Sequence, residues 1–277
     1  MSHTAGIDVG STYTKVVVLD DQGRIAGRAL TNTGFKMAEA ARRALDAALA
    51  QAGLSLGDLD YVASTGFGRF QIPFRNVNVT DLTATGHGAR TLFPRTMTVL
   101  DVGGQTMKAS RLGSNGMVKS FRLNDKCAAG TGAFLEKTAR YMGYTTEEIG
   151  PLASTSKEPV PISGVCAVFA ESEVINHLSH GSSPADIMHG AIASLVDRCV
   201  QLMKRVQMEP EFTLVGGILR FDTMVRVIRQ RLEGEVNVPE GDLVQYVAAL
   251  GAAALARRRL SKQAASPPEA ALREARS

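Results

Sequence analysis

Hydrophobic and polar residues follow a short-period pattern through the first third of the chain. Runs rich in β-branched residues, separated by turns that contain Gly, Asp and Ser, are typical of strands. Between two of these runs, a longer stretch rich in Ala, Arg and Glu is typical of a helix. The pattern therefore predicts a helix over residues 37–52 and strands over residues 5–9, 14–19, 25–30 and 61–64.

A second series of the same kind begins near Thr96 and then changes character. It predicts strands over residues 97–101, 107–111 and 118–123. From Gly132 onward apolar residues recur at intervals of three and four, which is the period of an amphipathic helix. We expect a strand over residues 212–215 and helices over residues 133–142, 167–179, 185–206, 221–232 and 243–259. Strands interleaved with helices in this way predict an α/β fold.

One segment is repeated. Asp8-Val-Gly-Ser-Thr-Tyr-Thr-Lys15 and Asp101-Val-Gly-Gly-Gln-Thr-Met-Lys108 share the pattern D-V-G-x4-K, 93 residues apart, and each joins one predicted strand to the next. Asp-Gly turns between strands are common, so a single copy would mean little. Four matching positions in matching context favour an internal duplication. We therefore expect a first half over residues 1–95, a second half over residues 96–262 and a flexible tail over residues 263–277.

The repeated turn has the chemistry of a phosphate site. Small residues leave backbone N–H groups accessible to phosphate oxygens, and a carboxylate at a strand end can hold Mg²⁺ or its water. The candidate catalytic residues are Asp8 and Asp101. The candidate nucleotide contacts are Gly10, Ser11, Thr12, Lys15, Gly103, Gly104 and Gln105. Lys15 and Lys108 are also consistent with solvent-facing strand lysines. The chain contains neither a P-loop nor a dinucleotide-binding GxGxxG after its first strand.

A third glycine motif follows the strand predicted at residues 212–215, where Gly216 and Gly217 precede a helix. Such a pair lets a ligand lie close to the backbone, although alone it is usually only a turn. Two phosphate hairpins followed by this pair resemble the actin, hexokinase and Hsp70 superfamily of ATPases. That resemblance implies duplicated RNase H-like domains that bind ATP, with Gly216 and Gly217 as adenosine contacts.

The three cysteines divide into two kinds. Cys127 and Cys166 each lie just before a predicted helix, where the helix dipole favours a thiolate. Each alone could be a small buried residue, but their common setting favours ligation. Cys199 belongs to the apolar face of the helix predicted at residues 185–206 and is interpreted as core. Two thiolates cannot complete a four-cysteine cluster, so a cluster would require a second subunit.

Two cysteine motifs bring a more specific resemblance. Lys126-Cys-Ala-Ala-Gly-Thr-Gly-Ala-Phe-Leu-Glu136 and Val165-Cys-Ala-Val-Phe-Ala-Glu-Ser-Glu173 resemble the BadF/BadG/BcrA/BcrD ATPase family. The opening GIDVGSTYTK, Ser64-Thr-Gly-Phe-Gly-Arg69 and Val215-Gly-Gly217 do so too. The similarity covers about residues 5–256, nearly the whole chain.

The resemblance implies an ATPase coupled to electron transfer. Cys127 and Cys166 are then ligands of a [4Fe–4S] cluster shared with a second ATPase subunit, in a homo- or heterodimer. The expected partners are a ferredoxin-type electron donor and the catalytic subunits of a benzoyl-CoA reductase or, alternatively, a 2-hydroxyacyl-CoA dehydratase. The dehydratase activators usually carry Gly-Gly-Gln-Asp, whereas this chain has Thr106 at the last position, and the usual Asn after the Gly-Gly pair is replaced around Phe221. These departures favour the reductase component.

Charge and composition add limits. The net charge of +4 is matched by Arg257, Arg258, Arg259 and Lys262 alone, so a nucleic-acid-binding face is not indicated. There is no signal-peptide pattern and no apolar run of about 18 residues, so we expect a cytoplasmic protein without a membrane span. Two other classes stay open, namely a cluster-free small-molecule kinase of the same fold and a non-enzymatic nucleotide sensor. Iron and sulfide content separates both from the electron-transfer interpretation.

Overall fold

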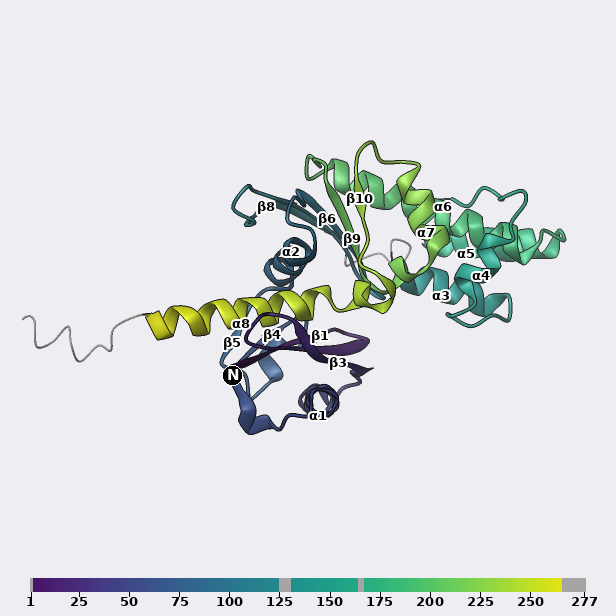
Figure 1. The fold of residues 1–277 in the computed structure, drawn as a ribbon. Helices are drawn as coiled ribbons and strands as arrows, with labels where there is room; N and C mark the ends of the chain where they lie inside the picture. The colour runs from purple at the N-terminus through teal and green to yellow at the C-terminus, as the bar shows by residue number, and fades with distance from the viewer. Residues whose placement is uncertain (1, 125–130, 164–166, 266–277) are drawn as a thin grey trace, which may run out of the picture. The chain divides into compact units, whose positions relative to one another are not determined.

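The computed structural model describes residues 2–124, 131–163 and 167–265. The chain divides into two units. The first runs from the start of the chain to Gly88 and continues from Ala248 onward, and the second runs from Ala89 to Val247. Each unit contains a five-stranded mixed sheet with helices (Figure 1).

The sheet of the first unit has the order β3-β2-β1-β4-β5. Its first three strands are antiparallel and the last two run parallel to β1. The strands are β1 (His3–Val9), β2 (Tyr13–Leu19), β3 (Ile25–Asn32), β4 (Leu59–Thr65) and β5 (Val77–Asn78).

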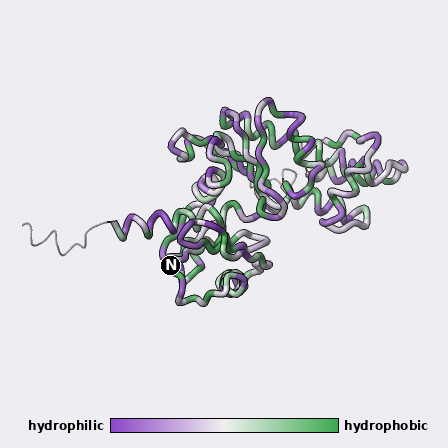
Figure 2. Tube along the Cα trace, viewed as in Figure 1, coloured by the Kyte–Doolittle hydropathy of each residue, from purple (hydrophilic) through white to green (hydrophobic). Residues whose placement is uncertain are grey.

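Small residues allow helices to pack closely on this sheet. Helix α1 (Met37–Ala52) buries alanines and leucines at helical spacing against β2 and β3, and it ends at Gly53 in the left-handed conformation. Helix α8 (Val247–Ala265) lies so close to β1 that a Cβ on Gly6 would be 2.0 Å from the Ala249 carbonyl oxygen. Helix α2 (Asp81–Leu92) crosses α8 at Gly251, where there is likewise no room for a Cβ between the two backbones. Toward its end α8 becomes hydrophilic (Figure 2).

The second sheet repeats the topology of the first. Its order is β10-β9-β6-β7-β8, which is the same arrangement of three antiparallel and two parallel strands. The strands are β6 (Thr98–Val102), β7 (Met107–Leu112), β8 (Val118–Asn124), β9 (Phe212–Val215) and β10 (Val236–Asn237). The helices of this unit are α3 (Gly132–Tyr141), α4 (Ile149–Ser154), α5 (Ala167–Ser179), α6 (Pro184–Lys204) and α7 (Asp222–Arg229). Short 3₁₀ helices complete the description, namely η1 (Leu56–Asp58), η2 (Arg69–Gln71), η4 (Gly217–Arg220) and η5 (Gly241–Gln245).

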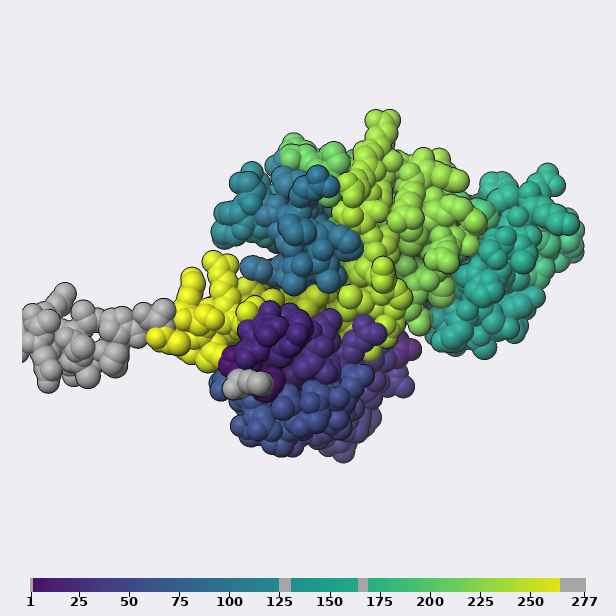
Figure 3. Space-filling model, viewed as in Figure 1, coloured from purple at the N-terminus to yellow at the C-terminus, as the bar shows by residue number. Residues whose placement is uncertain are grey.

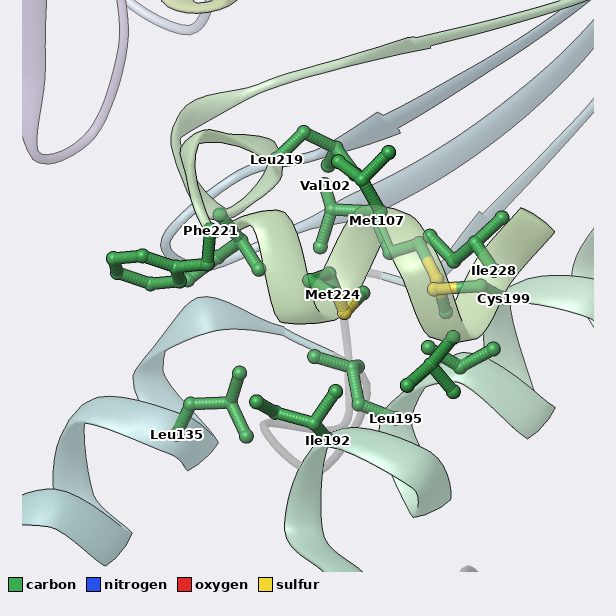
Figure 4. Close-up of a cluster of buried hydrophobic side chains, with 14 of the residues drawn as sticks. Val102, Met107, Leu135, Ile192, Leu195, Cys199, Leu219, Phe221, Met224 and Ile228 are labelled. Carbon is green, nitrogen blue, oxygen red and sulfur yellow. The ribbon is translucent and has the colours of Figure 1, made fainter. Parts of the chain in front are cut away.

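Helix α6 forms the centre of the second unit's core. Its apolar face packs between the sheet and α7, and Cys199 lies fully buried among these side chains (Figure 4). Burial raises the pKa of the Cys199 thiol to about 12, because a charged thiolate is disfavoured away from water. Its interpretation as core is consistent with this setting.

The predicted elements are largely present, with differences at their ends. Helix α2, helix α4 and the two-residue strands β5 and β10 were not predicted. Helix α8 begins at Val247 instead of residue 243 and runs to Ala265. It belongs to the first unit, whereas the predicted second half, residues 96–262, included most of it. Residues 266–277 of the predicted tail lie outside the described residues. No helix in the described parts of the chain is long and apolar enough to cross a membrane.

Candidate functional site

The first candidate hairpin places Asp8 beside Lys15. They are directly opposed in the β1–β2 ladder, and Lys15 Nζ lies 3.3 Å from Asp8 Oδ2. The Asp8 side chain is only 13% exposed, so the carboxylate is held at the strand end and not extended into water. The turn is closed by the Gly10 N–H, which donates to the Tyr13 carbonyl oxygen at 3.1 Å.

Glycines and small polar residues keep this turn open. Ser11 and Thr12 are exposed, and the Thr12 carbonyl accepts a hydrogen bond from the Thr33 N–H at 2.9 Å. At Gly10, a Cβ would come within 2.8 Å of the Tyr13 carbonyl oxygen. The turn therefore presents accessible backbone and hydroxyl groups beside a fixed carboxylate, which suits phosphate oxygens and a hydrated cation.

Gly66 completes this first arrangement. It follows β4 with φ of +87°, and a Cβ there would lie 2.5 Å from Asp8 Oδ1 and 2.6 Å from the Val9 carbonyl oxygen. Only glycine lets the chain turn this close to the Asp8 carboxylate. The sequence did not point to Gly66 as a site residue, although its motif, Ser64-Thr-Gly-Phe-Gly-Arg69, carried part of the family resemblance.

The second candidate hairpin has the same construction. Asp101 opposes Lys108 in the β6–β7 ladder, with Lys108 Nζ 3.7 Å from Asp101 Oδ2. The Gly103 N–H donates to the Thr106 carbonyl oxygen at 2.8 Å and closes the turn. Gly104 and Gln105 at its tip are exposed. Position 106, where the chain departs from the usual acidic residue, therefore closes this turn through its backbone.

Gly216 corresponds to Gly66. It follows β9 with φ of +103°, and a Cβ there would lie 2.3 Å from the Val102 carbonyl oxygen and 2.9 Å from Asp101 Oδ1. Its N–H donates to the Val244 carbonyl oxygen at 2.9 Å. The predicted adenosine motif thus begins directly against the carboxylate of the second hairpin, and Gly217 opens η4.

A cavity borders the far end of η4. Its volume is about 390 Å³, which lies within the range of small-molecule sites. The ring of Phe221 is mostly buried there, with the Arg220 guanidinium carbon 5.8 Å from its centroid. The cavity is lined by α4 and by the start of α7, namely by Glu147, Gly150, Pro151, Ser154, Arg220, Phe221, Asp222 and Thr223. Arg220, at the end of η4, is the lining residue that connects this cavity to the Gly216-Gly217 motif.

The structure brings the predicted residues together within each unit. Asp8, Gly10, Ser11, Thr12 and Lys15 share one hairpin. The second unit holds the other group, Asp101, Gly103, Gly104, Gln105, Gly216 and Gly217. That the two hairpins act on one nucleotide stays a prediction.

The predicted metal ligands, Cys127 and Cys166, lie outside the described residues. Within residues 2–124, 131–163 and 167–265, no group of three or more His, Cys, Asp or Glu side chains is placed to hold a metal ion. The described helices α3 and α5 begin five residues after Cys127 and directly after Cys166, respectively. These two helices pack against each other.

Comparison with known proteins identifies relatives over nearly the full length. The sequence profile of the BadF/BadG/BcrA/BcrD ATPase family matches residues 5–256. The 2-hydroxyisocaproyl-CoA dehydratase activator of Clostridioides difficile is 36% identical over 251 residues, 91% of this chain and 93% of that protein. One of the benzoyl-CoA reductase subunits of Thauera aromatica is 33% identical over 267 residues, 91% of this chain and 92% of that protein.

Solved structures agree with the fold class. The activator of the 2-hydroxyisocaproyl-CoA dehydratase from Clostridium difficile with bound ADPNP matches with a TM-score of 0.89 at 34% identity, over 96% of this chain and 98% of that one. A ROK family glucokinase from Streptomyces griseus matches with a TM-score of 0.57 at 16% identity, over 93% and 100%, which shows a shared fold alone. The predicted fold class, duplicated RNase H-like domains of the actin and hexokinase type, is confirmed, as is the family resemblance.

Proposed function

Because the chain belongs to the BadF/BadG/BcrA/BcrD ATPase family, we propose that it hydrolyses ATP to deliver electrons to a partner enzyme that acts on an acyl-CoA. The observation that carries this proposal is the pair of matching Asp–Lys–Gly arrangements. Each places a strand-end carboxylate against a glycine of positive φ, Gly66 or Gly216, where a Cβ would lie within 3 Å of the carboxylate. Two such turns on duplicated sheets are what a polyphosphate held from two sides requires.

The roles within the nucleotide site follow from this chemistry. Asp8 and Asp101 position Mg²⁺ and the attacking water. The two turns bind phosphate oxygens through backbone N–H groups and hydroxyls, and Lys15 neutralises phosphate charge or holds Asp8. The Gly216-Gly217 motif and the cavity beside Phe221 accept the adenosine. An ADPNP-bound relative with 34% identity supports a nucleotide at this fold.

A [4Fe–4S] cluster is the proposed electron carrier, held by Cys127, Cys166 and the same two residues of a second ATPase subunit. The donor set fits, because two thiolates per chain are half of a four-cysteine site. The packing of α3 against α5 also fits, since these helices follow the two cysteine-bearing segments. Held there, a cluster would supply one-electron transfer between a ferredoxin-type donor and the partner enzyme, and the nucleotide site would hydrolyse ATP to ADP and phosphate.

Two partner classes are proposed. The 36% identical relative is a dehydratase activator, which favours a 2-hydroxyacyl-CoA dehydratase. Thr106, in place of the acidic residue usual in such activators, favours a benzoyl-CoA reductase, and the 33% identical relative is a component of that enzyme. Activity of the purified chain with each set of catalytic subunits, using benzoyl-CoA or a 2-hydroxyacyl-CoA, distinguishes them.

The proposal is tested by anaerobic purification followed by assays of iron, acid-labile sulfide and ATP hydrolysis. We expect iron and sulfide in the wild-type protein and their loss in Cys127→Ala and Cys166→Ala. The matched control is Cys199→Ala, which removes a core thiol and keeps both cluster ligands. An iron-free wild-type protein that phosphorylates a small molecule would show instead that the chain is a kinase of this fold.

A further inference from the structure

A fully buried hydroxyl group lies at the end of β4, next to the first hairpin. Thr65 is 0% exposed, and its Oγ1 has no hydrogen-bond partner among the described residues. A buried polar group without a partner lowers stability, because it has lost its hydrogen bonds to water and gained none within the protein. The presence of such a group in a folded protein therefore calls for a specific reason.

Other buried hydroxyl groups in the same sheet do have partners. The Thr4 hydroxyl donates to the Ala253 carbonyl oxygen at 3.3 Å. The hydroxyl of Ser64, the residue before Thr65, donates to the Arg69 carbonyl oxygen at 2.8 Å. The first unit thus satisfies these hydroxyls with backbone carbonyls, and Thr65 differs from them.

Thr65 shares a face of the sheet with Asp8. The two residues are register partners in the parallel β1–β4 pair, so their side chains point to the same face. Neighbouring strands lie about 4.8 Å apart, and one water molecule can bond to two polar side chains at that spacing. Lys15 Nζ donates to Asp8 Oδ2, whereas Asp8 Oδ1 lies toward the end of β4, where a Cβ on Gly66 would be 2.5 Å from it.

Helix α8 covers this face of the sheet. Gly6 is two residues before Asp8 on β1 and so lies on the same face, and a Cβ there would be 2.0 Å from the Ala249 carbonyl oxygen. In the space-filling view α8, in yellow, lies directly against the purple strands of the first unit (Figure 3). The Asp8 side chain, 13% exposed, is therefore the neighbour of Thr65 on this face that a ligand can reach from solvent.

The second unit has no hydroxyl at the matching position. Val215 is the register partner of Asp101 and is followed by Gly216, as Thr65 is followed by Gly66. Val215 is only 2% exposed, so valine, which has nearly the shape of threonine, fits this strand position in a buried setting. Packing alone therefore does not require threonine, and the hydroxyl is particular to the first hairpin.

We propose that Thr65 is a positioning residue of the nucleotide site, whose hydroxyl accepts a hydrogen bond from a water of hydrated Mg²⁺ that also donates to Asp8. The inference rests on the proposed function, because Asp8 holds such a water only if the first hairpin binds Mg²⁺ with a nucleotide. The partnerless hydroxyl then has a use that the packing of the strand does not supply. A purely structural threonine would affect stability and leave metal-dependent binding unchanged.

The test compares Thr65→Val, which removes the hydroxyl, with Thr65→Ser, which keeps it. In Thr65→Val we expect calorimetry to show an affinity for Mg²⁺–ADP about tenfold lower, which corresponds to one hydrogen bond in a charged site. Its affinity for ADP in the presence of EDTA should match that of the wild-type protein. Thr65→Ser should recover most of the Mg²⁺–ADP affinity. Without nucleotide, the Tm of Thr65→Val should rise by about 2–4 °C, because a buried group without a partner has been removed.

A double-mutant cycle shows whether Thr65 acts together with Asp8. If both side chains bind the same water, Thr65→Val should reduce Mg²⁺–ADP affinity much less in the Asp8→Asn background than in the wild-type protein. The matched control is Thr138→Val. Thr138 is a buried threonine of α3 whose hydroxyl also has no partner among the described residues. Thr138→Val should raise the Tm similarly and leave Mg²⁺–ADP affinity unchanged.

The outcomes separate this inference from the proposed function. If Thr65→Val binds Mg²⁺–ADP as the wild-type protein does while Asp8→Asn does not, the inference is wrong and the nucleotide site stands. A lower Tm with unchanged Mg²⁺–ADP affinity would show that the hydroxyl binds a structural water instead, which also contradicts the inference. A wild-type protein that binds no Mg²⁺–ADP would overturn the proposed function and this inference with it.

Discussion

Replacing Gly216 with alanine tests whether the chain needs a glycine beside the Asp101 carboxylate. Gly216 has φ of +103° and ψ of 160°, a region that is almost confined to glycine and costs other residues about 1–3 kcal/mol. The added Cβ would also lie 2.3 Å from the Val102 carbonyl oxygen, and relieving such overpacking costs about 1–3 kcal/mol more. We therefore expect Gly216→Ala to lower the free energy of unfolding by about 2–6 kcal/mol.

A matched variant separates the two contributions. Gly143 has φ of +82°, and nothing lies within 4 Å of the position that a Cβ would occupy. Gly143→Ala should therefore cost only the conformational part, about 1–2 kcal/mol. Thermal unfolding of both variants measures the difference, since 1 kcal/mol shifts the Tm of a large domain by about 2–4 °C.

Gly216→Ala should also weaken ligand binding. The new Cβ would be 2.9 Å from Asp101 Oδ1, so the carboxylate must move. Calorimetry should show weaker Mg²⁺–ADP binding in Gly216→Ala than in Gly143→Ala. Equal Tm values and equal affinities in the two variants would refute the reasoning about this contact.

Other side chains make separate predictions. Asp8→Asn and Asp101→Asn should each reduce the rate of phosphate release from ATP by about 10²-fold or more while the fold, followed by circular dichroism, is retained; an unchanged rate would remove these carboxylates from the catalytic step. Cys199→Ala should lower the free energy of unfolding by about 1 kcal/mol, because it removes a fully buried thiol. In the native wild-type protein, mass spectrometry should show that this thiol resists alkylation by iodoacetamide. Hydrogen bonds from the side chains of Ser183 and Ser156 hold the pKa of Asp186 well below its ordinary value of 3.8. The stabilisation from Asp186 is therefore complete above pH 3.8 and is lost as the pH falls below it. Asp186→Asn should accordingly be less stable than wild type at neutral pH, with a gap in Tm that narrows in acid; a gap that is constant with pH would contradict this cause.

The sequence predicted the two hairpins because their signal is local. The repeat D-V-G-x4-K places an acidic and a basic residue seven positions apart around a tight turn. In a two-stranded ladder with a short loop, that spacing makes the two residues opposite neighbours. The structure has this register at both copies, Asp8 with Lys15 and Asp101 with Lys108.

The position of α8 could not be predicted in the same way. Its packing depends on close approach between small residues far apart in the chain, at Gly6 and Ala249 and at Gly251 and Ala84. No period or turn signal in the sequence records such contacts. A sequence-based interpretation that lacks these contacts assigns α8 to the second half, because α8 directly follows that half along the chain. The role of Gly66 was missed for a related reason, since the carboxylate it adjoins lies 58 residues earlier in the sequence, at Asp8.

Within the described residues, the two hairpin turns accept hydrogen bonds from different kinds of element. Both turns close with the same backbone bond, and both set a glycine of positive φ against the carboxylate. In the first unit, the Thr12 carbonyl at the tip accepts a bond from Thr33, in the loop after β3. In the second unit, the carbonyls of Gly103 and Gly104, which occupy the positions of Gly10 and Ser11 in the repeat, accept two bonds from the start of α3.

This difference matters for how each turn can move. A loop can absorb a movement of the turn by changing its own dihedral angles, whereas a helix moves as a rigid body because its backbone bonds fix each residue to the next turn. We therefore expect a movement of the first turn to be absorbed near Thr33, and a movement of the second turn to shift the start of α3. Duplication gave two similar hairpin turns, and the bonds from Gly132 and Ala133 attach the second of them to the start of a helix.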